Sequence, residues 1–346
     1  MHALSEGDRI NNYLLEARVG AGSFGEVWRA RHHVFDDIVA VKIPTDTQYV
    51  RNLQREGVTI HGLRHPNIVR AIDLDPYADP PYLIMEYVDG PSLREVIDRE
   101  KRGLPIAATT TVMRGILLAL TAAHDRAIIH RDITPANVLL DCTAEDLTKI
   151  TDQSVRVTDF GLGHVGGVTT QSMMQSGSLH AEEDGGVAGT LAYMSPEQKE
   201  GAELDARSDL YSCGIVLFEM LTGERPQGGE LPSSLRPDVP DHLDSVFKQC
   251  YARRERRFAS AGEMLAALSK RIDTRIPPPW PKGGLRSGGL NCPSCQQTVK
   301  ANDQFCIHCG RQLAESILHC LACQAFVNPS DRFCIFCGHD LRVLAS

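Results

Sequence analysis

The chain has 346 residues, 42% of them apolar and 23% charged, which is typical of soluble globular proteins and leaves room for more than one domain. The formal net charge of −8 argues against a chain built to coat nucleic acid, although a local basic patch is compatible with it. The sequence shows no signal-peptide core and no run approaching about 18 apolar residues. It therefore predicts no export signal, no membrane span and a cytoplasmic location.

The first informative stretch is VGAGSFGEVWRARHHVFDDIVAVKI, in which apolar and polar residues alternate on both sides of Gly20, Gly22 and Gly25. This pattern predicts two strands joined at the glycines. Glycines at such a turn let backbone N–H groups approach phosphate oxygens closely. Taken alone the spacing is weak evidence, and a plain glycine-rich hairpin explains it equally well.

Lys42 follows inside the apolar run VAVKI, where a lysine requires a partner. The best candidate is Glu56, on a helix predicted from RNLQREGVTIHGL. Next, YLIMEYVDG predicts a buried strand that leads into a turn. The segment TTTVMRGILLALTAAHDRAIIHRD then predicts a long, mostly apolar helix that delivers the chain to residues 128–140.

Residues 128–140 read IIHRDITPANVLL and place two polar side chains of distinct chemistry five positions apart. Asp132 can accept a proton or orient a hydroxyl, and Asn137 can offer an oxygen to a divalent metal. RVTDFGLG supplies a second acid, Asp159, at the end of a predicted strand. One acid near a nucleophile and an Asp/Asn pair for magnesium are what phosphoryl transfer requires.

The glycine loop, VAVK, HRD with an asparagine five residues later, DFG and SPE occur in the order found in protein kinases. Residues 13–270 thus resemble a eukaryotic-type serine/threonine protein kinase of the bacterial kind. The resemblance implies an α+β, two-lobed kinase fold over residues 10–272. It also implies ATP and Mg²⁺ as cofactors, and protein substrates with Ser or Thr acceptors. The alternative is a weakly active, kinase-like scaffold that acts through protein binding.

The resemblance also implies residue roles. Asp132 corresponds to the catalytic base, Lys42 to the lysine that contacts the α- and β-phosphates, and Asn137 and Asp159 to the magnesium ligands. The residues implied in ATP binding cover the phosphates, enclose the adenine or present the backbone to its edge: Val19, Gly20, Gly22, Gly25, Val27, Ala40, Lys42, Glu56, Met85, Glu86, Val88 and Leu139.

Further roles implied by the resemblance are structural. Glu197 is expected to pair with Arg257, Asp209 to brace the catalytic loop, and His130 to pack rather than to bind a ligand. GTLAYMSPE resembles the serine/threonine class and places Thr190 near Asp132.

Two features depart from the family pattern. Thr134 stands where serine/threonine kinases usually carry a lysine, so we include it with the candidate catalytic residues and expect a slowed enzyme. The segment DCTAEDLTKITDQSVRV is longer than the usual hairpin before DFG, and its simplest interpretation is a surface loop.

Four prolines and four glycines in residues 273–289 predict a linker. After it, residues 290–346 contain two copies of a unit with CxxC, ten residues, then CxxC and glycine. This spacing resembles a double zinc ribbon with two Zn²⁺ ions. A disulfide framework and a rubredoxin-like iron site are the alternatives. The expected ligands are Cys292, Cys295, Cys306, Cys309, Cys320, Cys323, Cys334 and Cys337.

The charge of this tail bears on its partner. Four Lys/Arg face four Asp/Glu from residue 290 onward, and eight thiolates around two Zn²⁺ would add a net −4. Because a nucleic-acid reader is expected to be basic, the composition favours a protein partner or the kinase domain itself.

Overall fold

The computed structural model describes residues 4–22, 25–46, 49–141, 147–160, 191–269 and 290–299, together with 308 and 313. The chain divides into two compact units, Met1–Ile272 and Asp273–Ser346, which are described separately below. The predicted linker at 273–289 lies outside the described residues.

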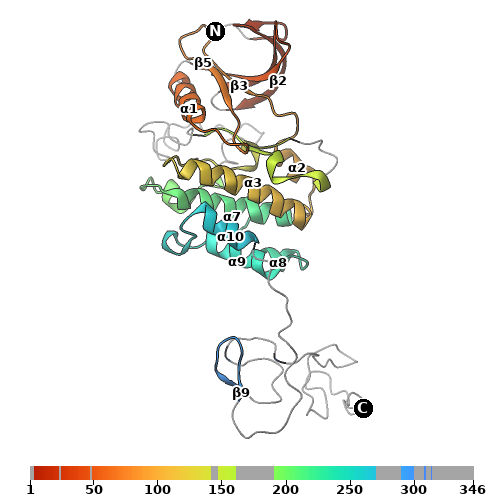
Figure 1. Ribbon diagram of the computed structural model, residues 1–346, viewed down its shortest axis with the longest axis vertical. Helices are drawn as coiled ribbons and strands as arrows, with labels where there is room; N and C mark the ends of the chain where they lie inside the picture. Colours follow the sequence, from red (N-terminus) through yellow and green to blue (C-terminus); the bar gives the residue numbers. More distant parts are fainter. Residues whose placement is uncertain are drawn as a thin grey trace. The chain divides into compact units, whose positions relative to one another are not determined.

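The first unit begins with an antiparallel sheet in the order β1-β2-β3-β4-β6-β5, beside which helix α1 lies (Figure 1). We call residues 4–86 the sheet lobe. The predicted pair of strands around the glycines is confirmed, because β2 and β3 pair from Tyr13 and His32 down to Gly22 and Gly25. The elements are β1 (Arg9–Ile10), β2 (Tyr13–Gly22), β3 (Gly25–His32), β4 (Ile38–Ile43), α1 (Val50–Gly62), β5 (Ala71–Asp75) and β6 (Tyr82–Glu86).

The two faces of this sheet belong to different apolar clusters. Val39 and Val41 of β4 pack in one cluster with Trp28, whereas Ala40 packs in a second cluster that includes Leu53 of α1. Side chains alternate between faces along a strand, so Lys42 lies on the same face as Ala40. The strand period therefore directs the lysine toward α1.

The described residues between 92 and 269 form a mainly helical lobe, in which α3 (Ile106–His124) and α7 (Ala206–Thr222) run side by side across the centre (Figure 1). Both helices contribute many fully buried residues to one core. By length and composition alone α3 would also suit a membrane, but 56% of its apolar window is buried within the lobe. The other helices are α2 (Leu93–Arg99), α6 (Pro196–Lys199), α8 (Pro232–Leu235), α9 (Asp241–Cys250) and α10 (Ala261–Ser269).

Two short strands, β7 (Val138–Leu140) and β8 (Val155–Val157), follow α3 and pair as an antiparallel ribbon. The turn η2 (Pro135–Asn137) leads directly into β7, and Asp159 follows β8 by two residues. The N–H of Thr158 donates to the carbonyl of Asn137, at 3.0 Å. This pairing holds the two predicted metal-binding side chains at the same end of the ribbon.

The connection between β7 and β8 differs in part from the predicted surface loop. Its returning half contains two short turns, η3 (Leu147–Lys149) and η4 (Asp152–Ser154), and Ile150 between them is buried. Asn67 also donates its Nδ2 hydrogens to the carbonyls of Asp152 and Val155. This half is therefore anchored to the core through Ile150, while Lys149, Thr151 and Gln153 are exposed, and residues 142–146 lie outside the described part of the chain.

Candidate active site

The side chain of Lys42 joins two carboxylates that come from different parts of the chain. Its Nζ lies 2.9 Å from both carboxylate oxygens of Glu56 and 2.7 Å from Oδ1 of Asp159. Lys42 is 7% exposed and Glu56 is fully buried. The predicted partnership of Lys42 with a glutamate on α1 is thus present, and Asp159 joins it.

One cation between two carboxylates leaves an excess negative charge in this buried cluster. Burial and the neighbouring Asp159 raise the pKa of Glu56 to about 8, although Lys42 opposes the shift. Burial also acts to raise the pKa of Asp159, but Lys42 outweighs it and holds that pKa below its usual range. Asp159 therefore favours its anionic form beside Lys42 and can bind a divalent cation.

Asp132 lies in a loop whose polar groups are paired with one another. Asn137 donates from Nδ2 to the carbonyl and to Oδ2 of Asp132, at 2.9 and 3.0 Å. The N–H of Asp132 donates to Nδ1 of His130, at 3.2 Å. Burial and the charge of Asp159 raise the pKa of Asp132, which suits a group that accepts a proton. With Nδ2 engaged by Asp132, Asn137 has its Oδ1 left to offer a cation.

Thr134 is 6% exposed and has an extended backbone between Asp132 and the turn η2. Its carbonyl accepts from the N–H of Asn137, at 3.1 Å, and its hydroxyl does not cap the turn. Thr134 is therefore a buried residue in the loop segment between Asp132 and Asn137. Thr190, expected near Asp132, lies outside the described residues.

A fully buried carboxylate on α7 holds the backbone that precedes Asp132. Asp209 accepts from the N–H groups of His130 and Arg131, at 2.9 and 2.8 Å, as the sequence led us to expect. Its Oδ2 also lies 2.8 Å from Nε2 of His124, a contact that the sequence analysis missed. The available signal was a histidine in the last turn of a mostly apolar helix.

His130 packs in the interior of the lobe, as predicted. The ring is fully buried, its centroid lies 4.4 Å from that of Phe160, and its Nε2 lies 2.9 Å from the carbonyl of Thr158. This contact joins the loop of Asp132 to the segment that carries Asp159.

Most residues predicted to enclose a nucleotide gather near Lys42. Val27 pairs with Lys42 across β3 and β4, and Ala40 pairs with Met85 across β4 and β6. One apolar cluster contains the side chains of Val27, Ala40, Met85, Val88 and Leu139. Gly20, Gly22 and Gly25 lie in the β2–β3 hairpin, Val19 beside them is half exposed, and Glu86 ends β6.

Comparison with known proteins decides the family. The Protein kinase domain family matches residues 13–271, and the Double zinc ribbon family matches residues 292–338. The chain belongs to the protein kinase family.

Relatives of this kinase domain include bacterial serine/threonine-protein kinases. The serine/threonine-protein kinase PknB of Mycobacterium tuberculosis is 34% identical over 297 residues, which cover 79% of this chain and 44% of PknB. PrkC of Bacillus subtilis is 32% identical over 289 residues, covering 77% and 42% respectively. The crystal structure of the M. tuberculosis PknI kinase domain superposes with a TM-score of 0.57 at 26% identity, covering 77% of this chain and 98% of that one. The chain spans about two-fifths of the length of these curated relatives.

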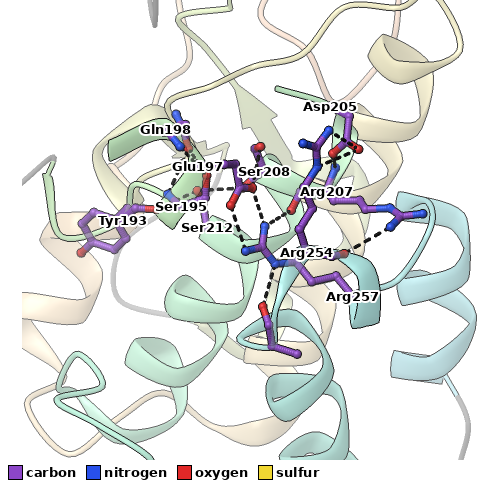
Figure 2. A network of polar contacts seen from close by, with 11 residues as sticks. Tyr193, Ser195, Glu197, Gln198, Asp205, Arg207, Ser208, Ser212, Arg254 and Arg257 are labelled. Atoms are coloured by element: carbon purple, nitrogen blue, oxygen red, sulfur yellow. Dashed lines mark hydrogen bonds and ion pairs between the residues drawn. The ribbon is translucent and has the colours of Figure 1, made fainter. Parts of the chain in front are cut away.

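A polar network ties α6 to α7 and to Arg257 in the helical lobe (Figure 2). The guanidinium of Arg257 donates to both carboxylate oxygens of Glu197, which also accepts from the Ser208 hydroxyl at 2.8 Å. Arg257 also stacks over the ring of Tyr211, 4.8 Å from its centroid. The predicted pairing of Glu197 with Arg257 is therefore present, and both side chains are buried.

In the second unit the structure describes the first CxxC pair. Cys292 is fully buried beside the hairpin of β9 (Leu290–Asn291) and β10 (Thr298–Val299). The N–H of Ser294 points at the Sγ of Cys292, at 3.4 Å. A tight turn that aims an N–H at sulfur stabilises a thiolate, so this donor set fits zinc. The remaining predicted ligands lie outside the described residues: Cys306, Cys309, Cys320, Cys323, Cys334 and Cys337.

The Glu197–Arg257 pair should make the free energy of unfolding depend on pH in the acid range. Burial alone would raise the pKa of Glu197, but hydrogen bonds from Arg257 and Ser208 lower it to about 2 from an ordinary value of 4.5. Ionised Glu197 therefore stabilises the fold fully above about pH 4.5, and this contribution disappears as the pH falls toward 2. Glu197→Gln should cost about 3 kcal/mol at pH 7, and this difference from wild type should shrink between pH 4.5 and 3.

The measurement is the free energy of unfolding from denaturant titrations at pH 7, 5, 4 and 3. Glu200→Gln, at an exposed glutamate that caps the same helix, serves as the matched control and should change little at any pH. A difference for Glu197→Gln that stays constant down to pH 3 would contradict the assignment.

Proposed function

We propose that this chain is an active serine/threonine-protein kinase that transfers the γ-phosphoryl group of ATP to hydroxyl groups of proteins. The observation that carries the proposal is the set of contacts around Lys42. Its ammonium group joins Glu56 on α1 to Asp159 after β8, while the hydrogen-bonded pair Asp132 and Asn137 lies at the same end of the β7–β8 ribbon. A positioned cation, two metal-binding side chains and one proton acceptor form the complement that phosphoryl transfer needs.

In this proposal each group does what its environment favours. Lys42, held by Glu56, contacts the α- and β-phosphates. Asp159 and Asn137 bind Mg²⁺, which when bound neutralises phosphate charge. Asp132, whose pKa is raised by burial, orients the acceptor hydroxyl and takes its proton.

The nucleotide would rest on the apolar cluster next to Lys42. Val27, Ala40 and Leu139, with Val19, enclose the adenine in this proposal, and Met85 lies behind it. The backbone of Glu86 and Val88 then reaches the adenine edge, and the glycine hairpin covers the phosphates.

A catalytically weak scaffold that works by binding is the second candidate, and Thr134 is the observation that favours it. The retained set of Lys42, Asp132, Asn137 and Asp159 favours the enzyme. For the tail we propose two Zn²⁺ ions and a role in regulation or docking, with a protein or the kinase domain itself as partner. The cytoplasmic location stays a prediction from the sequence.

The first prediction of this proposal concerns the chemistry of phosphoryl transfer. Lys42→Met and Asp159→Asn should each reduce phosphorylation of serine or threonine by more than about 100-fold, because each removes a phosphate or metal contact from the reacting centre. The assay follows transfer from labelled ATP with Mg²⁺ to the chain itself and to a generic acceptor protein. The matched controls are Lys101→Met and Asp73→Asn, which make the same chemical changes at exposed positions and should retain full activity. Equal activity in wild type and both site variants would refute the kinase proposal.

The second prediction concerns Thr134. A lysine at this position would bring positive charge to the transferring phosphoryl group. Its absence here should weaken transition-state stabilisation more than nucleotide binding. Thr134→Lys should raise kcat by about 10- to 1000-fold, at roughly 1.4 kcal/mol per tenfold, with little change in the KM for ATP.

Thr134→Met separates charge from bulk at this buried position. It adds a similar length of side chain without the ammonium group, and kcat should not rise. An increase in kcat with both substitutions, or with neither, would show that missing charge is not what limits this enzyme.

The third prediction concerns the tail. Elemental analysis of the purified chain should find two zinc ions, and Cys292→Ser should leave one, because it removes a thiolate from one of the two sites. Ser294→Ala, which keeps the backbone N–H that faces the sulfur, should leave both. Iron in place of zinc, or cysteines found paired in disulfides, would refute the zinc assignment.

A further inference from the structure

The residue before Asp132 has an unusual backbone conformation that is held from two sides. Arg131 has φ = 71°, in the left-handed region that is costly for a residue with a side chain. Its N–H donates to Oδ1 of Asp209, at 2.8 Å. Its carbonyl accepts from Nε2 of Gln198 on α6, at 2.7 Å. Both peptide groups that flank this strained residue are therefore fixed by side chains from distant parts of the chain.

The amide of Gln198 has a defined orientation. Its Oε1 accepts from the backbone N–H and the hydroxyl of Ser195, at 3.1 and 3.0 Å, in the capping box of α6 (Figure 2). With the oxygen engaged by two donors, the NH₂ group is directed toward the Arg131 carbonyl. The half-buried position of Gln198 strengthens this contact relative to one in open water.

Gln198 also closes a ring of contacts around the catalytic loop. The neighbouring Glu197 accepts from Ser208, and Ser208 precedes the Asp209 that holds the N–H of Arg131. The ring thus runs from the carbonyl of Arg131 through α6 and α7 and back to its N–H. A displacement of α6 changes the position of the Arg131 carbonyl directly.

We propose that Gln198 is a positioning residue for phosphoryl transfer. By holding the Arg131 carbonyl it fixes the peptide plane that leads into Asp132, and with it the direction of the Asp132 carboxylate toward the acceptor hydroxyl. This inference rests on the proposed kinase function and adds the residue through which α6 acts on the catalytic loop.

Gln198→Glu is the sharpest variant for this contact. The carboxylate keeps an oxygen for Ser195, so the capping box persists, but it places an oxygen instead of a donor against the Arg131 carbonyl. We expect kcat to fall by about 10- to 100-fold, because a small misplacement of the catalytic carboxylate is costly, while the KM for ATP changes by less than about twofold. Gln153→Glu, the same change at an exposed glutamine of the β7–β8 connection, should leave kcat unaltered.

A second readout does not depend on activity. Hydrogen–deuterium exchange of the peptide covering residues 128–137 should be faster in Gln198→Glu than in wild type, while exchange in α7 and the melting temperature stay close to wild type. An unchanged kcat, or a general rise of exchange across the helical lobe, would overturn the positioning role.

The two proposals fail in different ways. If wild type transfers no phosphate, the proposed function is refuted, and the exchange of residues 128–137 alone then decides whether Gln198 positions the loop. If wild type is active and Gln198→Glu matches it in kcat and exchange, the kinase stands and the positioning role is refuted.

Discussion

The buried carboxylate of Asp209 imposes the constraint on which the catalytic loop depends. A carboxylate with no access to water must collect hydrogen-bond donors from the protein. Here the donors are the N–H groups of His130 and Arg131, with the His124 ring beside them. Two successive N–H groups reach one carboxylate only if the chain bends sharply, which accounts for the left-handed backbone of Arg131. The position of Asp132 follows from that bend.

Lys42 imposes a second constraint, between the sheet lobe and the helical lobe. The strand period places its side chain on the face that meets α1, where Glu56 provides one carboxylate. The other comes from Asp159, which follows the β7–β8 ribbon. Because both contacts use one ammonium group, they form together only when α1, β4 and the end of that ribbon are correctly placed. Burial is the main cause of the raised pKa of Glu56, and the negative charge of the neighbouring Asp159 adds to it.

The sequence predicted those parts of the site in which a local pattern implies a position. The alternation around the glycines predicted the β2–β3 hairpin, and the apolar surroundings of Lys42 predicted its need for Glu56. The pairing of Glu197 with Arg257 and the place of Asp209 came from family resemblance rather than from any local pattern. His124 and Gln198 escaped prediction because each acts through one atom on a residue far along the chain. Ile150 escaped because Leu147 and Ile150 are too few apolar residues in a polar insertion to establish a helix or strand period.

Thr134 connects these constraints to the chemistry. A kinase with lysine at this position places positive charge beside Asp132, whereas here Thr134 is buried and uncharged. The ammonium group of Lys42 already contacts the carboxylates of Glu56 and Asp159. It therefore does not replace the missing positive charge at the γ-phosphate. Catalysis in the proposed mechanism then depends on accurate placement of the carboxylates of Asp132 and Asp159, because no extra positive charge compensates for a misplacement. The ring that runs through Asp209, Glu197 and Gln198 supplies that placement, and it matters more in this chain than it would with a lysine at position 134.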